Sequence, residues 1–336
     1  MNGTLVSQSS NTYAYRAWID LFRSYNKLSM DTHLRSAGLT EIRHNMNAVD
    51  ANLHAIIARN KEFTFYGRLH SDLFNSDKLL INGIALRIIL TKGKDIFNFI
   101  ASDAVAALGS TAAILEPDPK LSILDACLFI RKVKLAPNLL SAHAKALQQK
   151  NASYPIKRTE VKVINIAAGQ QMYTLDNIFM GSLPWLIIIG LVRHDAHAGS
   201  LKLSPLAFNH YNLNYLVLQV NGEMIPSKPF QPNYDINNYE REYFNYFKNL
   251  NSTLGPNAAA ITFEQFKSSV CLYPFNLNPD FDTPKESEYI NLAKDGFINI
   301  ELHFSANLAN SLKLICYAVF DNTIEIDFNR SVTTDF

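Results

Sequence analysis

The 336-residue sequence lacks the features that mark three broad classes of protein. Its three cysteines, Cys127, Cys271 and Cys316, are odd in number and far apart, which excludes a disulfide scaffold. Each lies in an apolar stretch, so we expect buried thiols in a reducing compartment. The most apolar run, residues 183–192, is too short to span a bilayer. With a net charge of +1 and no block of like charges, extended contact with nucleic acid is also disfavoured.

Catalytic signatures are missing as well. There is no G-x-S-x-G, no P-loop and no G-x-G-x-x-G. His194 and His197 form an H-x-x-H spacing, but no third ligand follows nearby, and Gly199 favours a solvated loop over a metal site. Glu325 alternates with isoleucines, so we place it on the polar face of a strand rather than in a catalytic pair. The sequence predicts a non-enzymatic protein without metal or cofactor.

Short alternating apolar segments bounded by turn residues make up most of the chain and predict antiparallel β structure. The expected strands are 63–74, 84–91, 121–135, 156–166, 185–193, 215–220, 297–304, 312–320 and 324–328. Helical spacing predicts three helices, which span about 14–25, 49–57 and 236–247. Pro137 suits the first turn of a fourth helix that ends near Asn151. Few β-α-β alternations occur, which favours sandwiches over a parallel sheet.

One pattern occurs twice. Asn2-Gly3 and Asn221-Gly222 are each followed by a bend and then by a tyrosine-rich helical stretch. The flanks of Asn221-Gly222 are strand-like, so this pair predicts a type I′ hairpin, whose two central residues need positive φ. We interpret the repeat as an internal duplication. On this interpretation the first copy begins inside its domain and lacks its leading strands.

Long strings of the sequence resemble the major capsid protein of Maverick/Polinton virus-like elements. These strings include NGTLVSQSSNTYAYRA, LLINGIALRI, ACLFIRKVKLAPNLLSAHAKAL, NHYNLNYLVLQVNGEMIPSKPFQPNY and VFDNTIEIDFNRSV, and they follow the family's order over nearly the whole chain. The residues of RHDAHAGS, 193–200, depart from the Asp- and Asn-rich loop expected there.

The resemblance implies a mainly β double jelly roll: two tandem antiparallel sandwiches with a few short helices in loops. The expected domains are a first jelly roll at 1–135 without its leading strands, a helical connector at 136–154 and a second jelly roll at 155–336. The implied function is a hexon-like major capsid protein whose homotrimers tile an icosahedral shell around double-stranded DNA. Implied partners are neighbouring capsomers and a penton or minor capsid protein, with only indirect contact to the packaged DNA. The implied location is the virion, after synthesis in the host cytoplasm and with assembly in the nucleus left open; secretion and membrane insertion are not expected.

Two groups of residues are candidates for contact with partners. The first, the aromatic set, lies in the two tyrosine-rich helices, where it can pack inward or meet a neighbouring subunit; we expect a mixture, with one face of each helix inward and one toward a neighbour. It comprises Tyr13, Tyr15, Trp18, Tyr239, Tyr243, Tyr246 and Phe247. The second, the basic set, either faces packaged DNA or a minor capsid protein, or is a solvated face of the connector; the absence of interleaved aromatic residues favours the solvated face. It comprises Arg131, Lys132, Lys134, Lys157 and Arg158.

Two other functions remain as alternatives. A jelly roll can also serve as a host-domesticated protein that binds a ligand or carbohydrate without forming capsids. Such a site needs aromatic residues and carboxylates gathered at a loop tip, and the sequence alone locates none. A metal-dependent enzyme of the cupin type needs two histidines and a glutamate at strand spacing with a distant histidine, and this pattern is missing.

Overall fold

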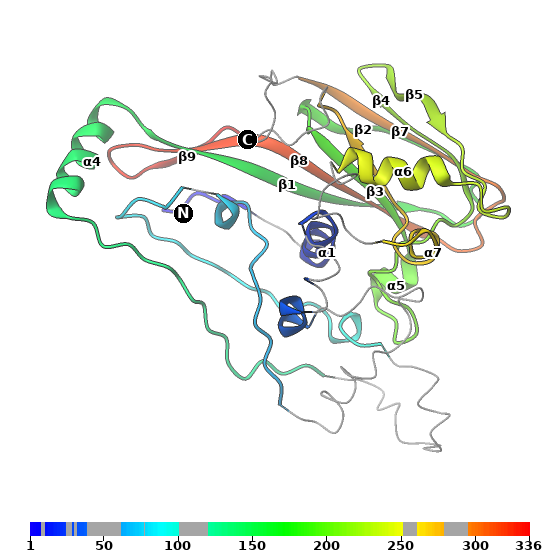
Figure 1. The fold of residues 1–336 in the computed structure, drawn as a ribbon, viewed down its shortest axis with the longest axis horizontal. Helices are drawn as coiled ribbons and strands as arrows, with labels where there is room; N and C mark the ends of the chain where they lie inside the picture. Colours follow the sequence, from blue (N-terminus) through cyan, green and yellow to red (C-terminus); the bar gives the residue numbers. More distant parts are fainter. Residues whose placement is uncertain are drawn as a thin grey trace.

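The computed structural model describes residues 1–7, 11–24, 29, 32–38, 62–76, 78–100, 120–250, 261–278 and 295–336. Within them the chain is mainly antiparallel β, with two sheets and a few short helices, as predicted (Figure 1). The strands are β1 (Ala152–Ile166), β2 (Met172–Ser182), β3 (Leu186–Arg193), β4 (Leu213–Val220), β5 (Glu223–Phe230), β6 (Leu272–Asn276), β7 (Asp295–Phe304), β8 (Leu312–Ile326) and β9 (Val332–Thr334).

The strand order is that of a jelly roll. One sheet has the order β1-β8-β3-β6, with β9 added to β8, and the other has the order β2-β7-β4-β5. Antiparallel pairs therefore join β1 to β8, β2 to β7, β3 to β6 and β4 to β5. A single long antiparallel ribbon that is rolled into two layers produces this pairing. The sequence predicted β1, β3, β4, β7 and β8, and its Asn221-Gly222 hairpin implied the start of β5, but it missed β2, β6 and β9.

The core lies between the two sheets. On β7 the alternation is regular: Ile298, Ile300, Leu302 and Phe304 are buried, and the residues between them are partly exposed. β3 is different, because seven of its residues, LIIIGLV, are all buried. Its second face is covered too, and at Gly190 a Cβ atom would lie only 2.5 Å from the ring of Phe208. A side chain larger than hydrogen does not fit there.

The Asn-Gly prediction is confirmed in its backbone geometry. Asn221 and Gly222 connect β4 to β5 with φ values of 52° and 86°, as a type I′ turn requires. Asn2 and Gly3 also have positive φ, at 43° and 90°. The side chain of Asn2 accepts a hydrogen bond from Ala85 N and donates one to Arg330 O, so this turn links the start of the chain to residues 85 and 330.

Helices cover the sandwich. They are α1 (Tyr13–Ser24), α4 (Pro137–Gln149), α5 (His194–Ala198), α6 (Glu240–Asn249) and α7 (Phe263–Ser268), with 3₁₀ turns η1 (His33–Ala37), η2 (Leu73–Asn75) and η3 (Asp95–Phe97). In Figure 1, α1 lies on the β1-β8 side, α6 lies near β6, and α4 caps the far end of the long β1-β8 ribbon. Pro137 stands in the first turn of α4, as expected.

Several predictions are wrong in detail. The described residues within 63–74, 84–91 and 121–135 contain no strand. A strand is defined by its hydrogen-bonded neighbour, and these segments follow long traces without one (Figure 1). Whether residues 1–135 form a jelly roll of their own stays a prediction. The helix expected at 49–57 lies outside the described residues.

Two corrections concern single residues. Cys127 is exposed, whereas Cys271 and Cys316 are buried as expected. Cys127 lies in the unpaired segment 121–135, where no second layer covers it. The second correction is that residues 194–198 form helix α5 rather than a solvated loop. The ring of His197 stacks on Tyr15, and its Nδ1 lies 2.9 Å from the Tyr15 hydroxyl oxygen, so packing against α1 orders this segment.

Candidate assembly surface

The aromatic set lies mostly inside the chain. Tyr15, Trp18, Tyr239 and Tyr246 are buried in the main core, and Tyr243 and Phe247 are partly buried against it. Tyr13 is the most exposed, at 37%. The inward packing that we weighed for these helices is therefore present. Contact between their outer faces and a second subunit stays a prediction.

Aromatic stacking and hydroxyl bonds fix the α6 residues. Tyr239 stacks on Phe263 with ring centroids 4.0 Å apart. The Tyr239 hydroxyl donates to Phe263 O at 3.2 Å, and the Tyr243 hydroxyl donates to Ile261 O at 2.8 Å. Burial and nearby carboxylates raise the pKa of Tyr239 to about 12, so its hydroxyl stays protonated and acts as a donor. These contacts tie α6 to the start of α7.

A buried ion pair holds α1 to the sandwich. Arg16 and Asp72 are each only 2% exposed, and Arg16 Nη2 lies 2.5 Å from Asp72 Oδ1. Asp72 also accepts a hydrogen bond from Thr159 N on β1 at 3.0 Å. One carboxylate thus joins α1, the segment before η2 and the first strand of the sandwich.

A second polar cluster is centred on Asp20. Its carboxylate accepts a hydrogen bond from the Tyr317 hydroxyl of β8 and lies 3.1 Å from His70 Nδ1. Burial alone would raise the pKa of Asp20, but His70, the Arg23 guanidinium, the Tyr317 hydroxyl and Arg16 together lower it below its ordinary value. Asp20 therefore stays ionised at neutral pH. The two clusters join α1 and residues 70–72 to β1 and β8 of the sandwich.

Large apolar side chains are exposed in two segments that overlap the expected strands 84–91 and 121–135. We call residues 79–90 and 120–135 the exposed apolar segments. Phe129 is 76% exposed, Leu124 72%, and Ile89 and Leu90 70% each. Exposed apolar surface of this extent usually marks an interface. These segments can bind another protein by burying their apolar side chains against it, and such binding requires no reactive group.

The structure does not bring the basic set together. Arg131, Lys132 and Lys134 are exposed within the apolar segment at 120–135. Lys157 pairs with Asp321 at 2.9 Å, and Arg158 pairs with Glu160 and lies over the Phe320 ring. Adjacent residues of β1 point to opposite faces of the sheet, so Lys157 and Arg158 cannot share one surface. The role of this set in contacting DNA or a minor capsid protein stays a prediction.

Sequence reasoning missed the Arg16–Asp72 and Asp20 clusters. A signal was present, because Arg16 and Asp20 stand four residues apart in the otherwise apolar helix YAYRAWIDLF. Their partners His70, Asp72 and Tyr317 carry no local pattern, since tertiary folding alone brings them there. Within the described residues no group of three metal-binding side chains gathers, and no helix there has the length and apolar character needed to cross a bilayer.

Comparison with known proteins found few relatives. No family model matches the chain. An uncharacterized protein of Caenorhabditis elegans is 20% identical over 341 residues, covering 100% of this chain and 78% of that protein.

Structural matches include a PBCV-1 protein fitted into a reconstruction of the virophage Sputnik, with a TM-score of 0.38 and 10% identity over 60% of this chain and 55% of that chain. The mavirus major capsid protein gives a TM-score of 0.30 and 11% identity over 56% of this chain and 42% of that chain. The matches thus span about half the length of these structures. The jelly-roll assignment rests on the strand order and the antiparallel pairs given above.

Proposed function

We propose that this chain is a structural subunit of a virus-like capsid, a major capsid protein of the double jelly-roll kind. The observation that carries the proposal is the presence, in one chain, of a jelly-roll sandwich and of the exposed apolar segments. A sandwich supplies rigid walls, and the apolar segments supply surface that is stable only when a neighbour covers it. The sequence resemblance to Maverick/Polinton capsid proteins supports the same conclusion.

The proposed assembly is a homotrimer. If residues 1–135 complete a second sandwich in the assembled particle, each subunit offers two similar walls, and three subunits offer six. Such a trimer fills a pseudo-hexagonal position in an icosahedral shell. Its partners are then other copies of itself, neighbouring capsomers and a penton or minor capsid protein. With a net charge of +1, contact with the packaged double-stranded DNA is indirect. The proposed location is the virion.

The oligomeric state of the purified chain tests this proposal. Sedimentation velocity over a range of concentrations should show trimers or larger assemblies. Phe129→Asp places a charge on a side chain that is 76% exposed in the isolated chain and should shift the distribution toward monomers. Phe328→Asp is the matched control, because Phe328 is also exposed, at 50%, but lies after β8, outside the exposed apolar segments.

A monodisperse monomer at concentrations of tens of micromolar would contradict the proposal. So would equal behaviour of Phe129→Asp and the wild-type chain. If Phe328→Asp dissociates the assembly as strongly as Phe129→Asp does, the contact surface lies elsewhere and the exposed apolar segments do not carry it.

A further inference from the structure

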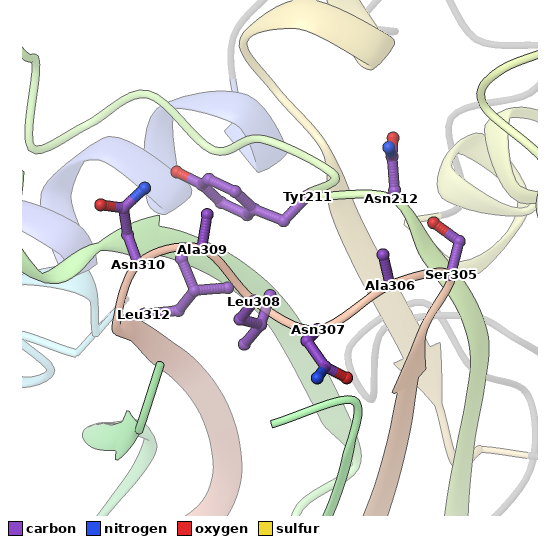
Figure 2. Close-up of a pocket in the computed structure, with 9 residues that line it drawn as sticks. All are labelled: Tyr211, Asn212, Ser305, Ala306, Asn307, Leu308, Ala309, Asn310 and Leu312. Carbon is purple, nitrogen blue, oxygen red and sulfur yellow. The ribbon is translucent and has the colours of Figure 1, made fainter. Parts of the chain in front are cut away.

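A pocket opens at the end of the sandwich where β3, β4, β7 and β8 are connected. It has a volume of about 260 Å³ and is lined by Tyr211, Asn212 and the loop from Ser305 to Asn310, with Leu312 below. Figure 2 shows the Tyr211 ring beside Ala309 and Asn310, with Asn212 and Ser305 together at the other end. The function proposed above does not use this pocket.

Backbone hydrogen bonds hold the walls of the pocket. In the 305–311 loop, Leu308 N donates to Gln170 O at 2.9 Å and its carbonyl accepts from Gly169 N at 2.8 Å. Ser305 N donates to Asn212 O at 2.9 Å, which joins the two walls directly. Ser311 O accepts from His194 N at 3.0 Å. The loop is thus fixed at both ends and in the middle, so the pocket is formed before any ligand arrives.

The Tyr211 wall is equally constrained. Tyr211 and Asn212 have φ values of 45° and 53°, and Leu213 N donates to His210 O at 2.8 Å, which closes a tight turn. Tyr211 is partly buried, with its side chain packed against the main core. This packing and the tight turn hold the ring, which lines the pocket beside Ala309 (Figure 2).

The polar groups of the pocket are neutral and unengaged. Among the described residues, no hydrogen bond occupies the side-chain amides of Asn212, Asn307 and Asn310 or the hydroxyl of Ser305, all of which are exposed. No charged side chain lines the pocket. Arg193 and Asp195 lie close to Tyr211, but they neutralise each other, with Arg193 Nε 2.9 Å from Asp195 Oδ1. The buried side chains of Leu308 and Leu312 form an apolar floor.

We propose that this pocket binds an uncharged saccharide. Amide and hydroxyl groups both donate and accept, which matches the hydroxyls of a sugar ring. The fixed aromatic face suits the apolar face of that ring, and the lack of a charged side chain disfavours a phosphate, carboxylate or ammonium ligand. The volume accommodates one or two sugar rings. Unlike the lectin site sought in the sequence, this pocket contains no carboxylate, and the proposal depends on no particular oligomeric state.

The test is an array of neutral glycans with glucose, galactose, mannose or N-acetylglucosamine at the tip, probed with the full chain, with sialylated glycans and heparin as charged comparators. Titration calorimetry with the best neutral glycan then gives a dissociation constant. We expect Asn310→Ala to weaken this binding roughly three- to tenfold, as the loss of one or two hydrogen bonds predicts. Tyr211→Ala should abolish it. Asn329→Ala is the matched control, because Asn329 is exposed and lies beyond β8 at its other end.

Thermal melting of each variant separates loss of binding from loss of folding. If Tyr211→Ala does not fold, Asn307→Ala and Asn310→Ala decide the matter, since both side chains are exposed. The proposal is overturned if the folded chain binds no neutral glycan, or binds only the acidic glycans. Equal affinity in Asn310→Ala, Asn307→Ala and Asn329→Ala would also overturn it, because the glycan would then occupy another place.

Discussion

The buried ion pair between Arg16 and Asp72 should be a main determinant of how firmly α1 is held. Both side chains are about 2–3% exposed, and Asp72 accepts two hydrogen bonds from Arg16 and one from Thr159 N. Removing only one partner leaves the other buried and uncompensated, which costs about 3–5 kcal/mol. Asp72→Ala and Arg16→Met should therefore each lower the free energy of unfolding by this amount. The double variant should lose clearly less than the sum of the two.

Urea unfolding followed by tryptophan fluorescence measures these changes, because Trp18 lies on the helix that the pair anchors. Asp321→Ala is the control. Its partner Lys157 is 30% exposed and Asp321 51%, so the loss should be at most about 1 kcal/mol. The reasoning is refuted if Asp72→Ala destabilises no more than Asp321→Ala, or if the two single changes simply add in the double variant.

Three further predictions concern the sandwich and α1. Burial lowers the pKa of His210 to about 4, so folding favours the neutral ring. The contribution of His210 to the free energy of unfolding should be fully present above pH 6.5 and should fall by at most about 3 kcal/mol as the pH drops to 4. Unfolding curves of His210→Gln measured across this pH range should lack the decrease. Gly190→Ala places a Cβ atom 2.5 Å from Phe208 and 2.7 Å from Leu272, so it should lower the free energy of unfolding by about 1–3 kcal/mol and lower the melting temperature. An unchanged melting temperature would show that Phe208 and Leu272 can move aside without cost. Trp18→Ala removes a side chain that is 7% exposed and should cost about 3–5 kcal/mol in urea unfolding; a loss below 1 kcal/mol would mean that α1 is not docked in solution.

The sequence predicted the second half of the chain well where local pattern and tertiary structure agree. The alternation in INIELHF matches the buried face of β7, and Asn221-Gly222 matches the hairpin turn. The hairpin implied a strand directly after Gly222, but the sequence did not indicate that β5, EMIPSKPF, continues to Phe230, because two prolines and two charged residues obscure the strand pattern. β5 is an edge strand paired only with β4, where prolines are tolerated.

The sites were harder to predict from the sequence, for a physical reason. Apolar alternation in 121–135 shows that those residues favour a sheet, but a sheet also needs a partner, which the sequence pattern cannot supply. The pocket combines Tyr211 with Asn310 across a gap of about a hundred residues, and only the rolled topology makes them neighbours. The sequence shows Arg16 and Asp20 as unusual charged residues in an apolar helix, but it does not indicate their partners His70, Asp72 and Tyr317.

The position of β8 has a consequence for how the chain is made. β8 is interior to its sheet, between β1 and β3, and its pairing with β1 joins residues at least 312 − 166 = 146 positions apart. During synthesis, both neighbours leave the ribosome before the strand that separates them exists. The edges of β1 and β3 that will pair with β8 must remain unpaired, or be shielded by chaperones, until translation has passed residue 326. Folding of this sheet is therefore a late, slow and non-local event, and the nascent chain is most prone to misassociation just before it is completed.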